Sequence, residues 1–246
     1  MASTAAAPAW AALASAEARL IVRNKAVLLT ALALPLVFGL AVMNYDLPAG
    51  GTGSIVGLQV IGTLLFTVYL GFTMTLVSRR QQLLLKRMLF APVSHATLIG
   101  GLLAPMAVVA FVQTALLAGL AGAATGTAPQ RVDLLIAAVL VGTAMSAALG
   151  FATASFTKTA ESAQYTTIPG FIVIAAGTLA VLSKTPGEVV PWVLAVPGAA
   201  VVELARLGWN GGGDTAYVLT ACGLVIVGAA VPAAVAAKVF HWNPKR

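Results

Sequence analysis

The chain has 246 residues, of which 60% are hydrophobic and 9% are charged, and its mean hydropathy is +0.97. Soluble domains are about 45–50% apolar and about 25% charged, so this composition excludes a water-soluble globular protein. The net charge of +7 does not indicate a nucleic-acid-binding protein, because the cations lie between long apolar runs and set a membrane topology.

Six apolar runs are long enough to cross a bilayer, which takes about 20 residues in a helix. They do not alternate apolar and polar residues, so they exclude the strands of a transmembrane barrel. We expect one all-α integral membrane domain over residues 1–246, with residues 1–25 in the cytoplasm or its membrane interface. The predicted spans are 26–44, 56–77, 96–122, 132–156, 165–183 and 215–238.

Residues 9–25 precede the first span and read AWAALASAEARLIVRNK. On a helix, Arg19 and Arg23 share one face and Trp10 lies with apolar residues on the other, which predicts an amphipathic helix in the cytoplasmic interface. Glu17 falls among the apolar residues, so we expect it to pair with a nearby cation. The alternative is a frayed leader whose charges only follow the positive-inside rule.

A cluster of cations lies between the second and third spans, in SRRQQLLLKRMLFAPVSH. Arg79 and Lys86 are seven residues apart, as are Arg80 and Arg87, so all four would point to one side of a helix. Pro92 would then end this helix, because a proline inside it removes a hydrogen bond and clashes with the preceding turn. The sequence predicts a short amphipathic helix across the cytoplasmic mouth, whose basic face is free for lipid phosphate or an acidic protein.

The fourth and fifth spans carry two further patterns. The fourth has a small residue at every fourth position, a ladder that lets helices approach closely, either inside one chain or at a dimer seam. The fifth begins QYTTIPG, where Pro169 and Gly170 predict a kink or a late start and form a candidate hinge. The members of the ladder are Gly142, Ser146, Gly150 and Ala154.

Residues 184–214 are too rich in Pro and Gly to form a span, yet they contain two short apolar pieces, 189–196 and 199–207. These pieces predict a re-entrant segment of two short helices that dip into the outer leaflet and return. Such a segment is tolerated where it packs against other helices. A disordered outer loop is the alternative.

The distribution of charge predicts the orientation. With the N-terminus inside the cell, six spans place both termini in the cytoplasm and most of the 14 Lys and Arg residues on the inner side. Only Arg131, Lys184 and Arg206 then lie on the outer side, together with most of the acidic residues.

The sequence lacks the motifs of common catalytic sites. It has no Walker-type glycine loop, no H-E-x-x-H, no G-x-S-x-G and no cluster of metal ligands, and its one cysteine, Cys222, lies in an apolar run. We therefore expect no catalytic residue and no metal site in this chain. The spans also contain almost no ionisable residues, which disfavours a secondary transporter coupled to ions or protons.

Four stretches lie in order between Glu17 and Gly208: EARLIVRNKAVLLTALALPLVFGL (Glu17–Leu40), LKRMLFAPVSHATLIGGLLA (Leu85–Ala104), LGFATASFTKTAESAQ (Leu149–Gln164) and VVPWVLAVPGAAVVELARLG (Val189–Gly208). Together they resemble the ABC-2 type transporter permeases, in particular the bacterial drug-resistance exporter subunits of the daunorubicin-resistance kind. The first is similar to the family's entry helix and first span, and the second to its cytoplasmic helix. The third is similar to the end of span four, and the last to the outer re-entrant region.

This resemblance implies that two permease chains pair, as a homodimer, and that each binds a separate cytoplasmic ABC ATPase subunit, which holds the ATP and Mg²⁺. The helix between spans two and three is expected to seat in the ATPase and transmit its motion. Family members commonly carry an acid where this chain reads RRQQ. The residues implied in coupling are Arg79, Arg80, Gln81, Gln82, Lys86, Arg87 and Pro92.

The function that the resemblance implies is an exporter permease of the bacterial inner membrane, with membrane lipids and the ATPase as partners. A nearly uncharged lumen suits a hydrophobic drug, a natural product or a lipid-linked molecule, so we expect a role in efflux and in multidrug or antibiotic resistance. The alternatives are a secondary transporter without an ATPase, and a non-transporting immunity or assembly factor in the membrane.

Overall fold

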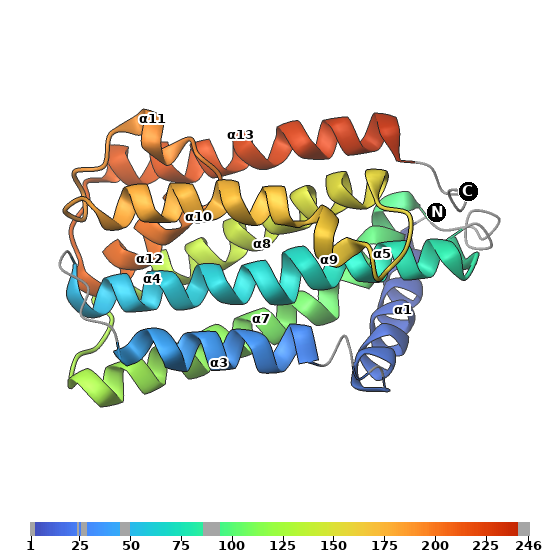
Figure 1. Cartoon of the computed structure of the whole chain (residues 1–246), viewed down its shortest axis with the longest axis horizontal. Helices are drawn as coiled ribbons and strands as arrows, with labels where there is room; N and C mark the ends of the chain where they lie inside the picture. Colours follow the sequence, from blue (N-terminus) through green and yellow to red (C-terminus); the bar gives the residue numbers. More distant parts are fainter. Residues whose placement is uncertain (1–2, 24, 26–28, 45–49, 86–93, 241–246) are drawn as a thin grey trace.

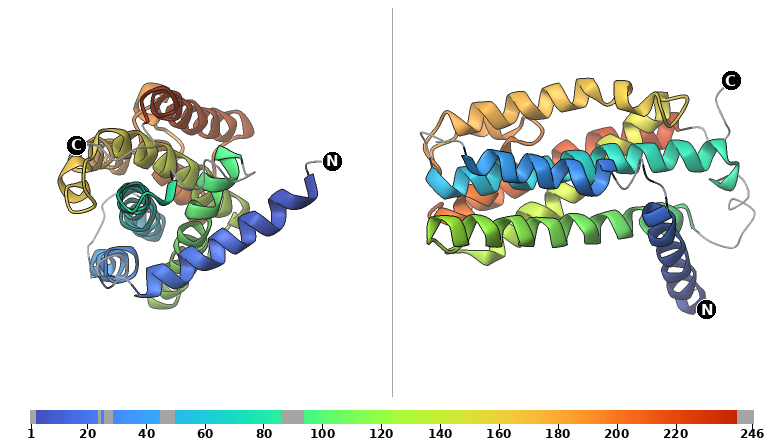
Figure 2. Two further views of the ribbon diagram at one scale, coloured as in Figure 1. Left: turned by 90° about the vertical axis from the view of Figure 1, so that its right-hand side faces the viewer. Right: turned by 60° about the horizontal axis from the view of Figure 1, so that its bottom comes forward.

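The computed structural model describes residues 3–23, 25, 29–44, 50–85 and 94–240, and the described chain forms helices and connections without a strand. The long helices lie side by side in an elongated bundle and run along it in alternating directions (Figure 1). Helix α1 (Ser3–Arg23) instead crosses one end of the bundle (Figure 2).

The remaining elements include two π-helical turns, η1 and η3, each continuous with the helix that follows it. The elements after α1 are, in chain order, η1 (Leu29–Ala33), α3 (Leu34–Ala41), η2 (Val42–Asn44), α4 (Gly51–Thr63), η3 (Leu64–Leu70), α5 (Gly71–Gln81), α7 (His95–Thr125), α8 (Val132–Phe156), α9 (Ala163–Thr166), α10 (Ile168–Leu182), α11 (Pro191–Leu194), α12 (Ala199–Asn210) and α13 (Thr215–Val239).

Five helical segments of the described chain are long and apolar enough to cross a membrane, and they overlap the second to sixth predicted spans. They are Gly51–Gln81, His95–Thr125, Val132–Phe156, Ala163–Leu182 and Thr215–Val239. These segments support an all-helical, multi-pass membrane protein. The first of them is a rod of α4, η3 and α5, which is largely buried among the other helices.

The structure describes part of the first predicted span, 26–44. Its described part is helical from Leu29 to Asn44, and the apolar helix Ala31–Asn44 is too short to count as a full span. Residues 26–28 lie outside the described residues. The helix runs along the bundle and packs on α4 and α7 (Figure 1). The six-span topology therefore stays a prediction.

The π-helical turns η1 and η3 pack against each other inside the bundle. The Thr67 hydroxyl on η3 donates a hydrogen bond of 2.7 Å to the carbonyl of Ala31 on η1. On α7, Gln113 Nε2 donates to the carbonyl of Leu32 at 3.1 Å. Such bonds satisfy backbone carbonyls that lipid cannot satisfy, so they hold η1 and the helix α3 that continues it against the bundle.

The ladder of small residues on α8 packs inside the chain. A Cβ added at Gly142 would collide with a methyl group of Leu64, and one added at Gly150 would lie 3.2 Å from a backbone oxygen of η3. The other two members, Ser146 and Ala154, are buried as well. Of the two predicted roles, the structure supports close packing of α8 on the central rod.

The predicted break at the start of the fifth span is present. Helix α9 ends at Thr166 and α10 begins at Ile168, with Pro169 in the first turn of α10. A Cβ added at Gly170 would collide with the ring of Tyr69 on η3, so only glycine allows this approach. Whether the break moves as a hinge stays a prediction.

We predict that Gly142→Val destabilises the folded protein by about 1–3 kcal/mol, because the added methyl groups have no room beside Leu64 and Val201. Gly228→Val is the matched control, since a Cβ at Gly228 on α13 meets open space. Thermal unfolding of both purified variants in one detergent measures the difference. Equal unfolding midpoints would contradict the packing of the ladder.

Candidate functional site

Charged residues of the described chain lie near the ends of the long helices, which form the two ends of the bundle (Figure 1). The end formed by α1, the end of α5, the α8–α9 connection and the end of α13 is called the basic end. Its charged residues are Glu17, Arg19, Arg23, Lys25, Arg79, Arg80, Lys158, Glu161 and Lys238. The opposite end, called the α12 end, has Arg131, Asp133, Lys184, Glu188, Glu203, Arg206 and Asp214.

Four ionisable side chains of the described chain are buried, although the predicted spans contain almost none. Glu17, Arg80, Glu203 and Arg206 are each at most 2% exposed. All four lie outside the predicted spans, so counting charges within the apolar runs missed them. The sequence carries a signal for the pair of Glu203 and Arg206, because an acid and an arginine three residues apart can pair on a helix.

Glu17 on α1 and Arg79 on α5 form an ion pair through both carboxylate oxygens. Arg79 donates from Nη2 to Oε1 at 2.8 Å and from Nε to Oε2 at 3.0 Å. Its Nη1 also donates to Gln82 Oε1 at 2.8 Å. This two-point contact fixes α1 to the end of α5. The prediction that Glu17 pairs with a nearby cation is confirmed.

Arg80 is fully buried and caps the C-terminal end of α8. It donates from Nη1 to the carbonyl of Ala154 at 3.0 Å and from Nη2 to the carbonyl of Thr157. Its guanidinium carbon lies 5.6 Å from the centre of the Phe240 ring. No carboxylate of the described chain pairs with it. The free carbonyls at the negative end of the helix dipole stabilise its charge instead.

The prediction of an open basic face is therefore wrong for Arg79 and Arg80. Helix α5 continues unbroken to Gln81, so both arginines belong to the end of the second span, where Arg80 faces the bundle. A left-handed turn at Leu83, with φ of 59°, follows the helix. The rest of the predicted coupling helix, Lys86, Arg87 and Pro92, lies outside the described residues and stays a prediction.

The N-terminal segment is the helix that the sequence predicts, in place of a frayed leader. It packs on the start of α7, where Leu13 occupies the space that a Cβ at Gly101 would need and Trp10 contacts the same turn. Arg19 and Arg23 are exposed. The apolar side of α1 thus partly faces the protein, and its placement in a membrane interface stays a prediction.

The segment 184–214 contains two short helices, as predicted, and α12 is the larger. Every residue from Ala199 to Trp209 is buried, and α12 packs on α4, α8, α10 and α13. A Cβ added at Gly57 on α4 would lie 3.0 Å from Val202 Cγ1. The alternative of a disordered loop is therefore wrong, because α12 forms a packed plug at its end of the bundle.

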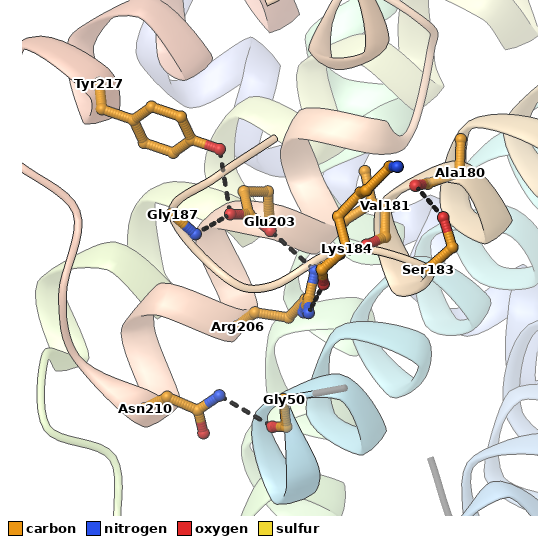
Figure 3. A network of polar contacts seen from close by, with 10 residues as sticks. All are labelled: Gly50, Ala180, Val181, Ser183, Lys184, Gly187, Glu203, Arg206, Asn210 and Tyr217. Carbon is orange, nitrogen blue, oxygen red and sulfur yellow. Dashed lines mark hydrogen bonds and ion pairs between the residues drawn. The ribbon is translucent and has the colours of Figure 1, made fainter. Parts of the chain in front are cut away.

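Glu203 and Arg206 on α12 form a fully buried ion pair (Figure 3). Arg206 Nη1 donates to Glu203 Oε2 at 3.0 Å and to the carbonyl of Val181 at 2.8 Å. Its Nη2 donates to the carbonyl of Lys184 at 2.6 Å. Burial lowers the pKa of the Arg206 guanidinium, whereas Glu203 favours its charged form and opposes that shift.

The same pair ties α12 to two more segments (Figure 3). Glu203 Oε1 accepts hydrogen bonds from the backbone N–H of Gly187 at 2.6 Å and from the Tyr217 hydroxyl on α13 at 3.1 Å. At the end of α12, Asn210 donates to the carbonyl of Gly50, just before α4, at 2.8 Å. The plug is thus bonded to α10, to the connection after it, to α13 and to the start of α4.

An apolar groove of about 430 Å³ opens on the side of the bundle, between η1, η3 and the α9–α10 break. It lies where two π-helical turns and the candidate hinge meet, and π-helical turns often occur at functional sites. Its apolar lining residues are Leu29, Leu34, Phe66, Leu70, Ile168 and Phe171. The groove has the chemistry to hold a hydrophobic ligand.

The bundle and its charged ends define a multi-pass membrane protein. The sequence profile of the ABC-2 type transporter family matches residues 8–206, which is most of the chain. The chain therefore belongs to this family and is the membrane permease component of an ABC-type transporter. Members of the family normally work with an ABC ATPase and form dimers. Comparisons with curated proteins and with solved structures found no match.

We predict that Arg206→Met lowers the free energy of unfolding by about 3–5 kcal/mol, because it leaves Glu203 buried without its cation. Combining it with Glu203→Leu should recover part of this loss, since both charges are then removed. Denaturation of the purified variants in one detergent measures the difference.

The matched control is Arg131→Met, which breaks the exposed pair with Asp133 and should change the free energy of unfolding by less than about 1 kcal/mol. A double variant that loses as much as the sum of its two single variants would show that Glu203 and Arg206 do not depend on each other.

Proposed function

We propose that this chain is the permease subunit of an ATP-driven exporter in a bacterial inner membrane. The observation that carries the proposal is the family match over residues 8–206 in a chain whose sequence has no Walker motif. ATP and Mg²⁺ bind to a separate ABC ATPase, and two permease chains pair as a homodimer. The transport of drugs or natural products would give the cell multidrug or antibiotic resistance.

The basic end faces the cytoplasm in this proposal. Most described cations lie at that end, together with α1 and the end of α13, whereas acids and cations are mixed at the α12 end. Cytoplasmic loops of membrane proteins carry an excess of Lys and Arg, so this polarity supports cytoplasmic termini. The α12 plug then lies toward the outside.

The ATPase docks on the connection between α5 and α7, which includes the sequence-predicted coupling residues Lys86, Arg87 and Pro92. Arg79 and Arg80 lie at the end of α5, next to this connection, and act inside the permease. The contact of Arg79 with Glu17 links movement of the connection to α1, and the bonds of Arg80 to the end of α8 link it to the fourth span. Both arginines thus transmit motion within the permease.

The substrate is a hydrophobic drug, a natural product or a lipid-linked molecule, and the apolar groove beside η1 and η3 is its entry site. The groove is lined mainly by apolar side chains and opens on the flank of the bundle, where a molecule dissolved in lipid can reach it. Its lining includes Thr167 and Ile168 at the α9–α10 break, so movement at the neighbouring Pro169 and Gly170 changes its shape. The substrate leaves beneath the α12 plug.

The burial of Glu203 bears on the alternative of a secondary transporter, since such proteins use acids inside the membrane. Here one carboxylate oxygen binds Arg206, and the other accepts from Gly187 and Tyr217. These contacts account for the buried acid as part of a structural pair. The ATP-driven exporter is therefore better supported than the secondary transporter.

The partner is tested by affinity purification of the tagged chain from its native host, in mild detergent, followed by mass spectrometry. We expect a near-stoichiometric ABC ATPase, which is lost when Lys86 and Arg87 are both changed to Glu. Reversing Arg19 and Lys238, two exposed cations of the same end, is the matched control and should keep it. Recovery of the permease without an ATPase, in several detergents and in nanodiscs, would contradict the proposal.

The transmission step is tested by reversing the α1–α5 pair. Glu17→Arg and Arg79→Glu should each abolish most ATP-driven efflux of a hydrophobic dye from proteoliposomes, because each puts like charges at a contact of 2.8 Å. The double variant restores opposite charges and should recover most of the efflux. A double variant as inactive as the single ones, with unchanged thermal stability, would count against this role of the pair.

A further inference from the structure

A second cavity, of about 400 Å³, lies at the basic end between α1, α5 and the α8–α9 connection. It is separate from the apolar groove, and of its lining residues the proposed export function uses only the Glu17–Arg79 pair. Three cations contribute to its lining: Arg23, Lys25 and Arg79. They come from two segments far apart in the sequence, so the fold brings them together.

The charges in this cavity do not balance. Glu17 is the only acidic residue among its described lining residues, and Arg79 already binds both of its carboxylate oxygens. Arg23 and Lys25 are exposed and form no ion pair with any carboxylate of the described chain. The cavity therefore has a surplus of positive charge, with two cations available to an anion.

Apolar side chains share the lining with these cations. Leu20 on α1 and Met74 on α5 line the same cavity, and the hydroxyl-bearing Thr75 and Ser78 lie on α5 beside them. A small soluble anion needs no apolar surface, whereas a phospholipid offers a phosphate and the start of an acyl chain. This combination of cations and apolar side chains matches the basic pockets between membrane helices that bind phospholipid head groups.

We propose that this cavity binds one anionic phospholipid, with its phosphate between Arg23 and Lys25 and its apolar part against Leu20 and Met74. The lipid lies beside the Glu17–Arg79 pair and joins α1 to α5 by a second contact. It is thus a bound component of the permease, distinct from the transported substrate.

The test compares lipid retention by native mass spectrometry of the full chain, taken from nanodiscs that contain phosphatidylglycerol and phosphatidylcholine. The double variant Arg23→Gln with Lys25→Gln should retain about 30-fold less phosphatidylglycerol, or about fivefold less for each cation. Arg19→Gln with Lys238→Gln removes the same charge from exposed positions of the same end and should retain the lipid. Arg23→Lys with Lys25→Arg keeps the charge and should retain it as well.

Three results would overturn the proposal. Equal losses in both charge-removing variants would show a general effect of surface charge. Displacement of the lipid by an equal concentration of inorganic phosphate would show a site for free anions. Unchanged lipid retention with loss of the co-purified ATPase would assign the cations to an acidic protein surface. Thermal unfolding of each variant separates these results from misfolding, and the charge-keeping variant still tests the site if Arg23→Gln does not fold.

Discussion

The burial of charge at the ends of an apolar bundle is the constraint on which this structure depends. A buried ion costs several kcal/mol unless a partner and further hydrogen bonds compensate for the lost water. At the α12 end, Glu203 and Arg206 compensate each other and also bind backbone groups of neighbouring segments. At the basic end, Glu17 holds Arg79, and the carbonyls at the end of α8 hold Arg80. Helix ends supply these partners because their backbone groups lack bonds within the helix.

The two ends of the bundle are bonded in different ways. The α12 plug is bonded to several helices at once, and it is buried from Ala199 to Trp209. At the basic end of the described chain, α1 is joined to α5 through the Glu17–Arg79 ion pair and to α7 through side-chain packing. In the proposed function, a movement that enters through the α5–α7 connection reaches α1 through the Glu17–Arg79 pair and α8 through the bonds of Arg80.

The sequence predicts the long helices well, because apolar runs in a membrane leave the backbone no alternative to the helix. The ladder at Gly142 and the break at Pro169 are also predictable, since small residues and proline act locally. The burial of Arg80 is not predictable in this way, because it depends on where α8 ends in space. The π-helical turns η1 and η3 carry no signal in the composition. The seven-residue spacing of Arg80 and Arg87 predicts that both lie on one short helix after the second span. In the structure, Arg80 belongs to α5, which extends to Gln81.

In the proposed function an ABC ATPase docks at the basic end, and site-specific photo-cross-linking in living cells tests this docking. A photoreactive amino acid replaces Gln82, which is exposed just after α5, or Ala128, which is exposed in the α7–α8 connection at the other end. We predict that the probe at Gln82 captures an ABC ATPase and that the probe at Ala128 does not. Capture only at Ala128, or no capture at either position in cells that export the substrate, would contradict the claim.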